Sequence, residues 1–150
     1  MLKMPKEASA GDFEPEIVLL YCEHSVNSGS GKSSLSLKTS GFKARTAVLP
    51  CSSKVEVGYL LKILEEGADG VEVVGCPEAQ CRFFVGSNRA EKRVAYARSL
   101  ISEVGMGAER IGMTRGEKIS AERLSEVASL RSGAVKALGP NPMKKKPVKP

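Results

Sequence analysis

The sequence predicts an α/β fold, in which a small parallel sheet carries helices on its faces. Short apolar segments that are typical of strands alternate along the chain with longer segments whose apolar residues have helical spacing. Such alternation indicates βαβ units, which build parallel sheets. The chain has 150 residues, of which 41% are hydrophobic and 27% are charged, and this suits a single globular domain.

Four segments are expected to be strands. Residues 16–21 form a short, continuous apolar run that is typical of a buried strand. The segment ARTAVLP, residues 44–50, ends at a proline, and DGVEVVGC, residues 69–76, is entered through a turn. AERIGMT, residues 108–114, is a short fourth strand. Because the carboxyl ends of parallel strands lie at one edge of the sheet, we expect a functional site at that edge.

The first predicted helix is SSKVEVGYLLKILEEG, residues 52–67. Ser52 or Ser53 would cap its amino end and Gly67 its carboxyl end. Its apolar residues recur at helical spacing and are expected to face the core. They are Val55, Tyr59, Leu60, Ile63 and Leu64.

Two further helices are predicted, at residues 87–105 and 116–138, and Gly139-Pro140 stops the second of them. The inner face of the helix at 87–105 is expected to carry Val94, Ala97, Leu100, Ile101 and Val104.

The folded domain is expected to span residues 15–139. Residues 1–14 would form a flexible polar lead, and residues 140–150 a disordered basic tail rich in proline and lysine. The formal net charge of the chain is +6, and without the four lysines of this tail it would be +2. These four are Lys144, Lys145, Lys146 and Lys149.

Composition argues against two kinds of partner. The small remaining charge and the 5% of aromatic residues do not favour a nucleic-acid surface. No apolar run reaches the ~20 residues that cross a bilayer. The amino terminus also has no apolar stretch typical of a secretory signal, so we expect a cytoplasmic protein.

The stretch VNSGSGKSS, residues 26–34, is similar to a loop that binds nucleotide phosphates. That loop needs a glycine five residues before its Gly-Lys pair, and Val26 occupies this position. Gly41 interrupts the segment in which a helix would present its amino end to phosphate. The stretch is therefore interpreted as a flexible connection, and an NTPase is rejected.

The four cysteines occur where the sheet predicts a site. Cys22 ends the first predicted strand, Cys51 ends the second and Cys76 ends the third, while Cys81 lies in the loop that follows Cys76. Cysteines that only fill a core could occur anywhere in a strand. In a reducing compartment, four thiols at one edge indicate metal or redox chemistry rather than disulfides.

The spacing of these cysteines leaves two kinds of metal centre open. Structural zinc usually uses paired cysteines that are separated by two to four residues, and only CPEAQC is close to this pattern. Thiolates from separate loops suit an iron–sulfur cluster at least as well.

Three stretches of the sequence resemble one known family. They are PEIVLLYCEH, LPCSSKVEVGYLLKILEEGADGVEVVGCPEAQC and VGSNRAEKRVAYARSLISEVGMGAERI. They are similar to the delta subunit of the F420-non-reducing, or methyl-viologen-reducing, hydrogenase. The most specific parts are Cys-Ser-x-x-Val from Cys51, the run EEGADGV, the Gly-Cys with a second cysteine five positions on, and Asn-Arg leading into Arg-Val.

The resemblance implies a thioredoxin- or flavodoxin-like domain with one [2Fe-2S] cluster on Cys22, Cys51, Cys76 and Cys81. It implies a non-catalytic electron-transfer subunit between a hydrogenase, dehydrogenase or similar redox partner and a heterodisulfide-reductase-like flavoprotein. Complexes of this kind belong to anaerobic metabolism, and some perform flavin-based electron bifurcation. The alternative hypothesis is a zinc-stabilised interaction module without a redox role.

The sequence departs from the family around the first cysteine. Family members often have Cys-Cys-x-Trp-Cys there, whereas this chain has Tyr21-Cys22-Glu23-His24-Ser25. Four thiols still suffice for one [2Fe-2S] cluster. His24, the single histidine, is therefore interpreted as a polar loop residue.

Charge is also expected near the site. The helices that follow Cys51 and Cys81 would present their amino ends to the same edge, and their dipoles favour negative charge there. Four basic residues are expected around the start of the helix at 87–105, on its solvent side, where they could raise the potential of a cluster and dock an acidic partner. They are Arg82, Arg89, Lys92 and Arg93.

Overall fold

Four parallel strands form a single sheet in the described part of the chain. The computed structural model describes residues 14–22, 41–49, 55–75, 86–116 and 119–142. The strands lie in the order β2-β1-β3-β4, which is the flavodoxin-like order up to its fourth strand. The predicted α/β fold with a small parallel sheet is confirmed. The strands are β1 (Glu16–Cys22), β2 (Lys43–Leu49), β3 (Gly70–Gly75) and β4 (Ile111–Arg115).

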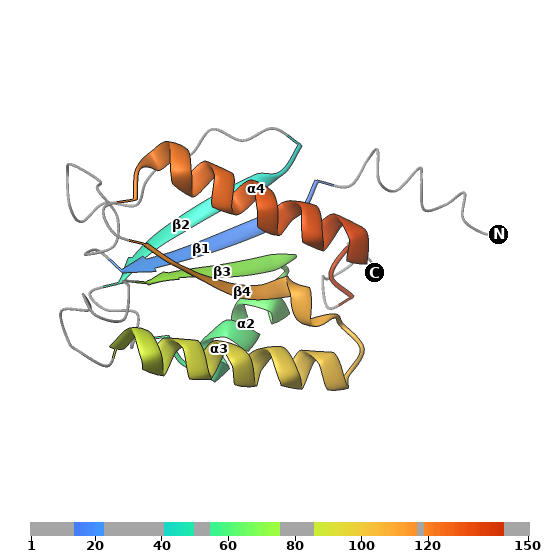
Figure 1. The fold of residues 1–150 in the computed structure, drawn as a ribbon. Coiled ribbons are helices and arrows are strands. Elements are labelled where there is room, and N and C mark those ends of the chain that lie inside the picture. Colours follow the sequence, from blue (N-terminus) through green and yellow to red (C-terminus); the bar gives the residue numbers. More distant parts are fainter. Residues whose placement is uncertain (1–13, 23–40, 50–54, 76–85, 117–118, 143–150) are drawn as a thin grey trace.

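Three helices cover the two faces of this sheet within the described residues (Figure 1). Helices α2 (Val57–Glu65) and α3 (Gly86–Glu103) pack on one face, and α4 (Ala121–Leu138) packs on the other. A short 3₁₀ turn, η3 (Ala108–Arg110), precedes β4.

Strand β1 supplies core residues to both faces because successive side chains of a strand point in opposite directions. Val18 and Leu20 belong to the apolar cluster under α2 and α3. Ile17, Leu19 and Tyr21 belong to the cluster under α4. Burial on both faces explains why this strand is a continuous apolar run in the sequence.

Two helices begin later than the sequence predicted. Helix α2 starts at Val57, and its N-cap residue Glu56 makes no side-chain capping bond. Helix α4 starts at Ala121, where the Ser120 hydroxyl accepts a hydrogen bond from the backbone N–H of Arg123 at 3.1 Å. The serine cap fixes this second start. The predicted caps Ser52 and Ser53 lie outside the described residues.

Glycines end two helices at the predicted places. Gly67 has φ +119°, and its N–H donates to the Leu64 carbonyl at 3.0 Å. The next N–H, that of Ala68, donates to the Ile63 carbonyl at 3.3 Å, which completes a Schellman motif. Gly139 has φ +88° after the last residue of α4.

Two apolar residues predicted to face the core are exposed instead. Tyr59 is 43% exposed, because it lies at the margin of the stripe formed by Leu60, Ile63 and Leu64. Val104 is 72% exposed, because α3 ends at Glu103 and the helical periodicity no longer applies.

Buried polar groups connect the segments at the amino ends of the parallel strands, called here the amino edge of the sheet. The Asp69 carboxylate accepts hydrogen bonds from the backbone N–H groups of Glu16 and Asn141, both at 2.9 Å. The Asn141 side chain donates to the carbonyls of Leu64 and Ala68 at 2.7 and 2.6 Å. Asn141, a residue that we assigned to the tail, is thus buried and bonded at this edge.

Arg110 joins the same edge from the start of β4. Its guanidinium donates to the carbonyls of Met106, Asp69, Gly139 and Pro140 at 2.9–3.1 Å. Burial lowers the pKa of Arg110, and the charge of Asp69 opposes this shift. An arginine remains protonated at neutral pH, so its donors stay available for these four carbonyls.

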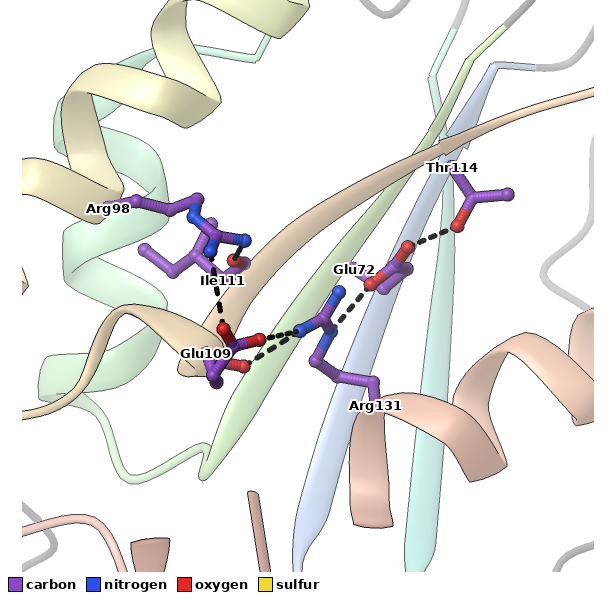
Figure 2. A network of polar contacts seen from close by, with 6 residues as sticks. All are labelled: Glu72, Arg98, Glu109, Ile111, Thr114 and Arg131. Atoms are coloured by element: carbon purple, nitrogen blue, oxygen red, sulfur yellow. Dashed lines mark hydrogen bonds and ion pairs between the residues drawn. The ribbon is translucent and has the colours of Figure 1, made fainter. Parts of the chain in front are cut away.

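Glu72 is a buried carboxylate on the α4 side of β3 (Figure 2). Arg131 of α4 donates its Nε–H to Glu72 at 2.7 Å, and the Thr114 hydroxyl donates to the other carboxylate oxygen. Gly112 leaves room for the guanidinium, since a Cβ there would lie 1.9 Å from Arg131 Nη2. The charge of Glu72 is therefore compensated by a residue on the helix above it.

The same arginine continues the network around β4 (Figure 2). Arg131 of α4 and Arg98 of α3 both pair with the Glu109 carboxylate, at 3.4 and 3.5 Å. Arg98 also donates to the carbonyl of Ile111 at 2.9 Å. Because α3 and α4 lie on opposite faces, these contacts tie both helices to the start of the edge strand.

We expect Arg131→Met to lower the free energy of unfolding by about 3 kcal/mol, because it leaves the buried Glu72 without its cation. The control is Arg123→Met in the same helix, which removes an exposed pair with Glu126 and should cost less than about 1 kcal/mol. Urea unfolding followed by circular dichroism measures both. Equal losses for the two variants would show that the buried network contributes no more than a surface pair.

Candidate functional site

The carboxyl ends of β1, β2 and β3 lie side by side. Cys22 pairs with Leu49 of β2, and Tyr21 pairs with Val74 of β3, so Gly75 is level with Cys22. In the sequence, Cys51 comes two residues after Leu49, and Cys76 comes directly after Gly75. The structure therefore aligns the three strand ends that lead to these predicted ligands.

Of the four predicted ligands, only Cys22 lies within the described residues. It is the last residue of β1 and is 2% exposed. Cys51, Cys76 and Cys81 lie outside the described ranges, as does His24. In the ranges that are described, no three His, Cys, Asp or Glu side chains gather closely enough to hold a metal ion. The four-cysteine site thus stays a prediction.

Cys22 belongs to the face of the sheet that α2 and α3 cover. It follows Leu20 by two residues, and Leu20 lies in the cluster packed under these helices. Side chains two residues apart in a strand share a face. The thiol therefore lies on the same side of the sheet as the amino ends of α2 and α3.

These two amino ends favour negative charge. The first backbone N–H groups of an α-helix have no partner within the helix, and the dipole adds partial positive charge there. Neither α2 nor α3 has an acidic residue in its first turn, whereas α4, on the opposite face, has Glu122. The first turns of α2 and α3 therefore carry no carboxylate, and the acidic residue at the amino end of α2 is its N-cap, Glu56.

The predicted basic residues of α3 do not all lie in solvent. Arg89 and Lys92 are exposed, as expected. Arg93 is only partly exposed, and it donates a hydrogen bond from Nη1 to the carbonyl of Val55 at 2.9 Å, so its assignment to the solvent side was wrong. Arg82 lies outside the described residues.

A further arginine, which sequence reasoning missed, fixes the start of α3. Arg115 at the end of β4 donates to the side chains of Asn88 and Glu91 at 3.1 and 2.6 Å. The sequence held one signal for it, since a basic residue directly after a short strand lies at the carboxyl edge of the sheet. Its partners could not be read from the sequence.

None of the helices in the described ranges combines the length and the apolar character that crossing a membrane requires.

Comparison of the chain with known protein families identifies one match. The family described as methyl-viologen-reducing hydrogenase, delta subunit, matches residues 17–139. This range includes the four described strands, apart from Glu16 at the start of β1, and all four cysteines.

Individual relatives agree with this match. The chain is 36% identical to the vhu iron-sulfur subunit of the F420-non-reducing hydrogenase of Methanocaldococcus jannaschii over 100 residues, which cover 67% of this chain and 75% of that protein. It is 30% identical to the vhu iron-sulfur subunit of Methanococcus maripaludis over 131 residues, which cover 87% of this chain and 98% of that protein.

A third relative is a longer protein, and only a part of it matches this chain. A subunit of the ferredoxin:CoB-CoM heterodisulfide reductase of Methanosarcina mazei is 27% identical over 120 residues, which cover 80% of this chain and 15% of that protein. The chain belongs to the family of methyl-viologen-reducing hydrogenase delta subunits.

Proposed function

We propose that this protein is an electron-transfer subunit that holds one [2Fe-2S] cluster on Cys22, Cys51, Cys76 and Cys81. The observation that carries the proposal is the alignment of three parallel strand ends, each of which ends at or just before one of these cysteines. Membership in the delta subunit family supports it, as do the hydrogenase relatives whose names call them iron-sulfur subunits.

The donor set fits such a cluster. Iron in these clusters is held by cysteine thiolates, and four are needed for one cluster. Cys22 is buried at the carboxyl ends of the strands, on the face of the sheet that α2 and α3 cover. Burial there would shield a cluster from water, and the partial positive charge at helix amino ends favours an anionic group nearby.

The cluster would supply the redox chemistry by gaining and losing one electron. The residues of this chain hold it, shield it and set its surroundings. Electrons would arrive from a hydrogenase, dehydrogenase or similar donor protein. The chain itself would not be catalytic, because no acid, base or nucleophile stands out in its sequence.

The second redox partner that we propose is a heterodisulfide-reductase-like flavoprotein, which would exchange electrons with the cluster. In heterodisulfide reductase subunits of two Methanosarcina species, a segment of the polypeptide is itself similar to this protein. A domain carried within one polypeptide and also present as a separate chain is expected to work beside the same catalytic unit. We further propose a cytoplasmic complex of anaerobic metabolism, with flavin-based electron bifurcation among its reactions.

The first experiment is anaerobic purification followed by metal and sulfide analysis. We expect about two irons and two sulfides per chain, with the visible charge-transfer absorption and the paramagnetic signal of a reduced [2Fe-2S] cluster. A colourless protein that carries zinc and no iron would contradict the proposal and support the zinc-stabilised interaction module.

The second experiment replaces the ligands one at a time. Cys→Ser at positions 22, 51, 76 and 81 should each reduce the iron content at least about tenfold, because oxygen replaces a soft thiolate poorly. The circular dichroism spectrum should stay native. Because a buried hydroxyl at position 22 costs about 1–3 kcal/mol of stability, Cys22→Ala serves as a second variant there.

His24→Ala is the control for this series and should keep the normal iron content. A Cys22 variant with a wild-type paramagnetic signal, together with loss of that signal in His24→Ala, would replace the four-cysteine site by one that uses the histidine.

A further inference from the structure

Arg93 of α3 makes a contact that joins two distant parts of the chain. Its Nη1 donates to the backbone carbonyl of Val55 at 2.9 Å, across 38 residues of sequence. Val55 is fully buried, and Arg93 is partly buried. The contact therefore lies within the molecule, on the face of the sheet that α2 and α3 cover.

The two ends of this contact stand close in sequence to two of the predicted ligands. Val55 is four residues after Cys51, and α3 begins at Gly86, five residues after Cys81. The first backbone bond of α2 is accepted by the carbonyl of Glu56, so the Val55 carbonyl precedes the helix. Arg93 thus attaches the segment that follows Cys51 directly to the helix that follows Cys81.

The helix that carries Arg93 is itself held in place. Arg115 of β4 binds Asn88 in the first turn of α3 and Glu91 in its second turn. Since β4 is part of the sheet, α3 is fixed to it near its amino end. A contact from α3 to Val55 can therefore position the Val55 segment against the sheet.

We propose that Arg93 is a positioning residue for the cluster, and that it does so by fixing Val55, four residues after Cys51, to α3, the helix that follows Cys81 in the sequence. This inference rests on the proposed function. A planar guanidinium with several donors on a long stem suits the role, because it reaches a carbonyl from the neighbouring helix and keeps its charge when partly buried. Groups that orient ligands typically change metal affinity 10- to 100-fold.

The test uses the full chain with its cluster, prepared anaerobically, and three variants. Arg93→Met removes the donor and keeps the apolar stem. Arg93→Lys keeps the charge and one donor group on a shorter side chain. Lys92→Gln is the matched control, because it removes the same charge from the adjacent, exposed position of the same helix.

We expect Arg93→Met to release iron to a chelator about tenfold faster than wild type. Its reduced paramagnetic signal should also be broadened or shifted, because that signal reports how the thiolates are arranged. Lys92→Gln should match wild type in both, and Arg93→Lys should lie between. Arg131→Met, which removes the buried pair with Glu72 on the opposite face of the sheet, controls for a general loss of stability measured by urea unfolding.

A loaded Arg93→Met protein with the release rate and signal of wild type would overturn this inference and leave the proposed function intact. The same holds if Arg131→Met, which destabilises the protein from the opposite face of the sheet, changes the signal as much as Arg93→Met does. A wild-type chain that carries no iron would overturn the proposed function, and this inference with it.

Discussion

Parallel pairing of β1 with β2 on one side and with β3 on the other organises the described part of the molecule. The three strands run in the same direction, so their carboxyl ends meet at one edge, with Cys22, Leu49 and Gly75 level with one another. The register is strongly specified, because both faces of β1 are buried. A slip of one residue would exchange the residues under α4 with those under α2 and α3 and would move Cys22 to the other face.

The amino and carboxyl ends of the strands have different roles. The amino edge is closed by Asp69, Arg110 and Asn141, whose buried groups bond to one another's segments and hold the chain beyond α4. At the carboxyl edge lie Cys22 and the amino ends of the helices on its face, where we place the function. Because these stabilising bonds lie at the amino ends of the strands, the residues at the carboxyl ends are available to bind a cofactor.

The sequence predicted those features that depend on local pattern. The continuous apolar runs of β1 and β3 marked buried strands, and Gly67 and Gly139 marked helix ends because their positive φ angles favour glycine. The starts of α2 and α4 were placed too early, because serine or glycine before an apolar stretch does not reveal which residue begins the helix. Tyr59 was placed inside although it lies at the stripe margin.

Contacts between distant residues were not predictable from the sequence. Glu72 is the carboxylate within the apolar strand β3, and its partner Arg131 is 59 residues away. Arg93 was read as a solvent-facing charge, because nothing in α3 indicates the Val55 carbonyl beside it. The cysteines were instead predicted as ligands from a topological rule, because the carboxyl ends of parallel strands lie together whatever the details of packing.

The central claim is that four thiolates, gathered at this edge, hold two irons. X-ray absorption at the iron edge of the purified protein tests it most directly, because the fine structure identifies the atoms around the metal. The account predicts that sulfur is the only element bonded to iron, with four sulfur atoms around each iron and one iron neighbour. A nitrogen or oxygen atom bonded to iron, or zinc as the sole bound metal, would contradict it.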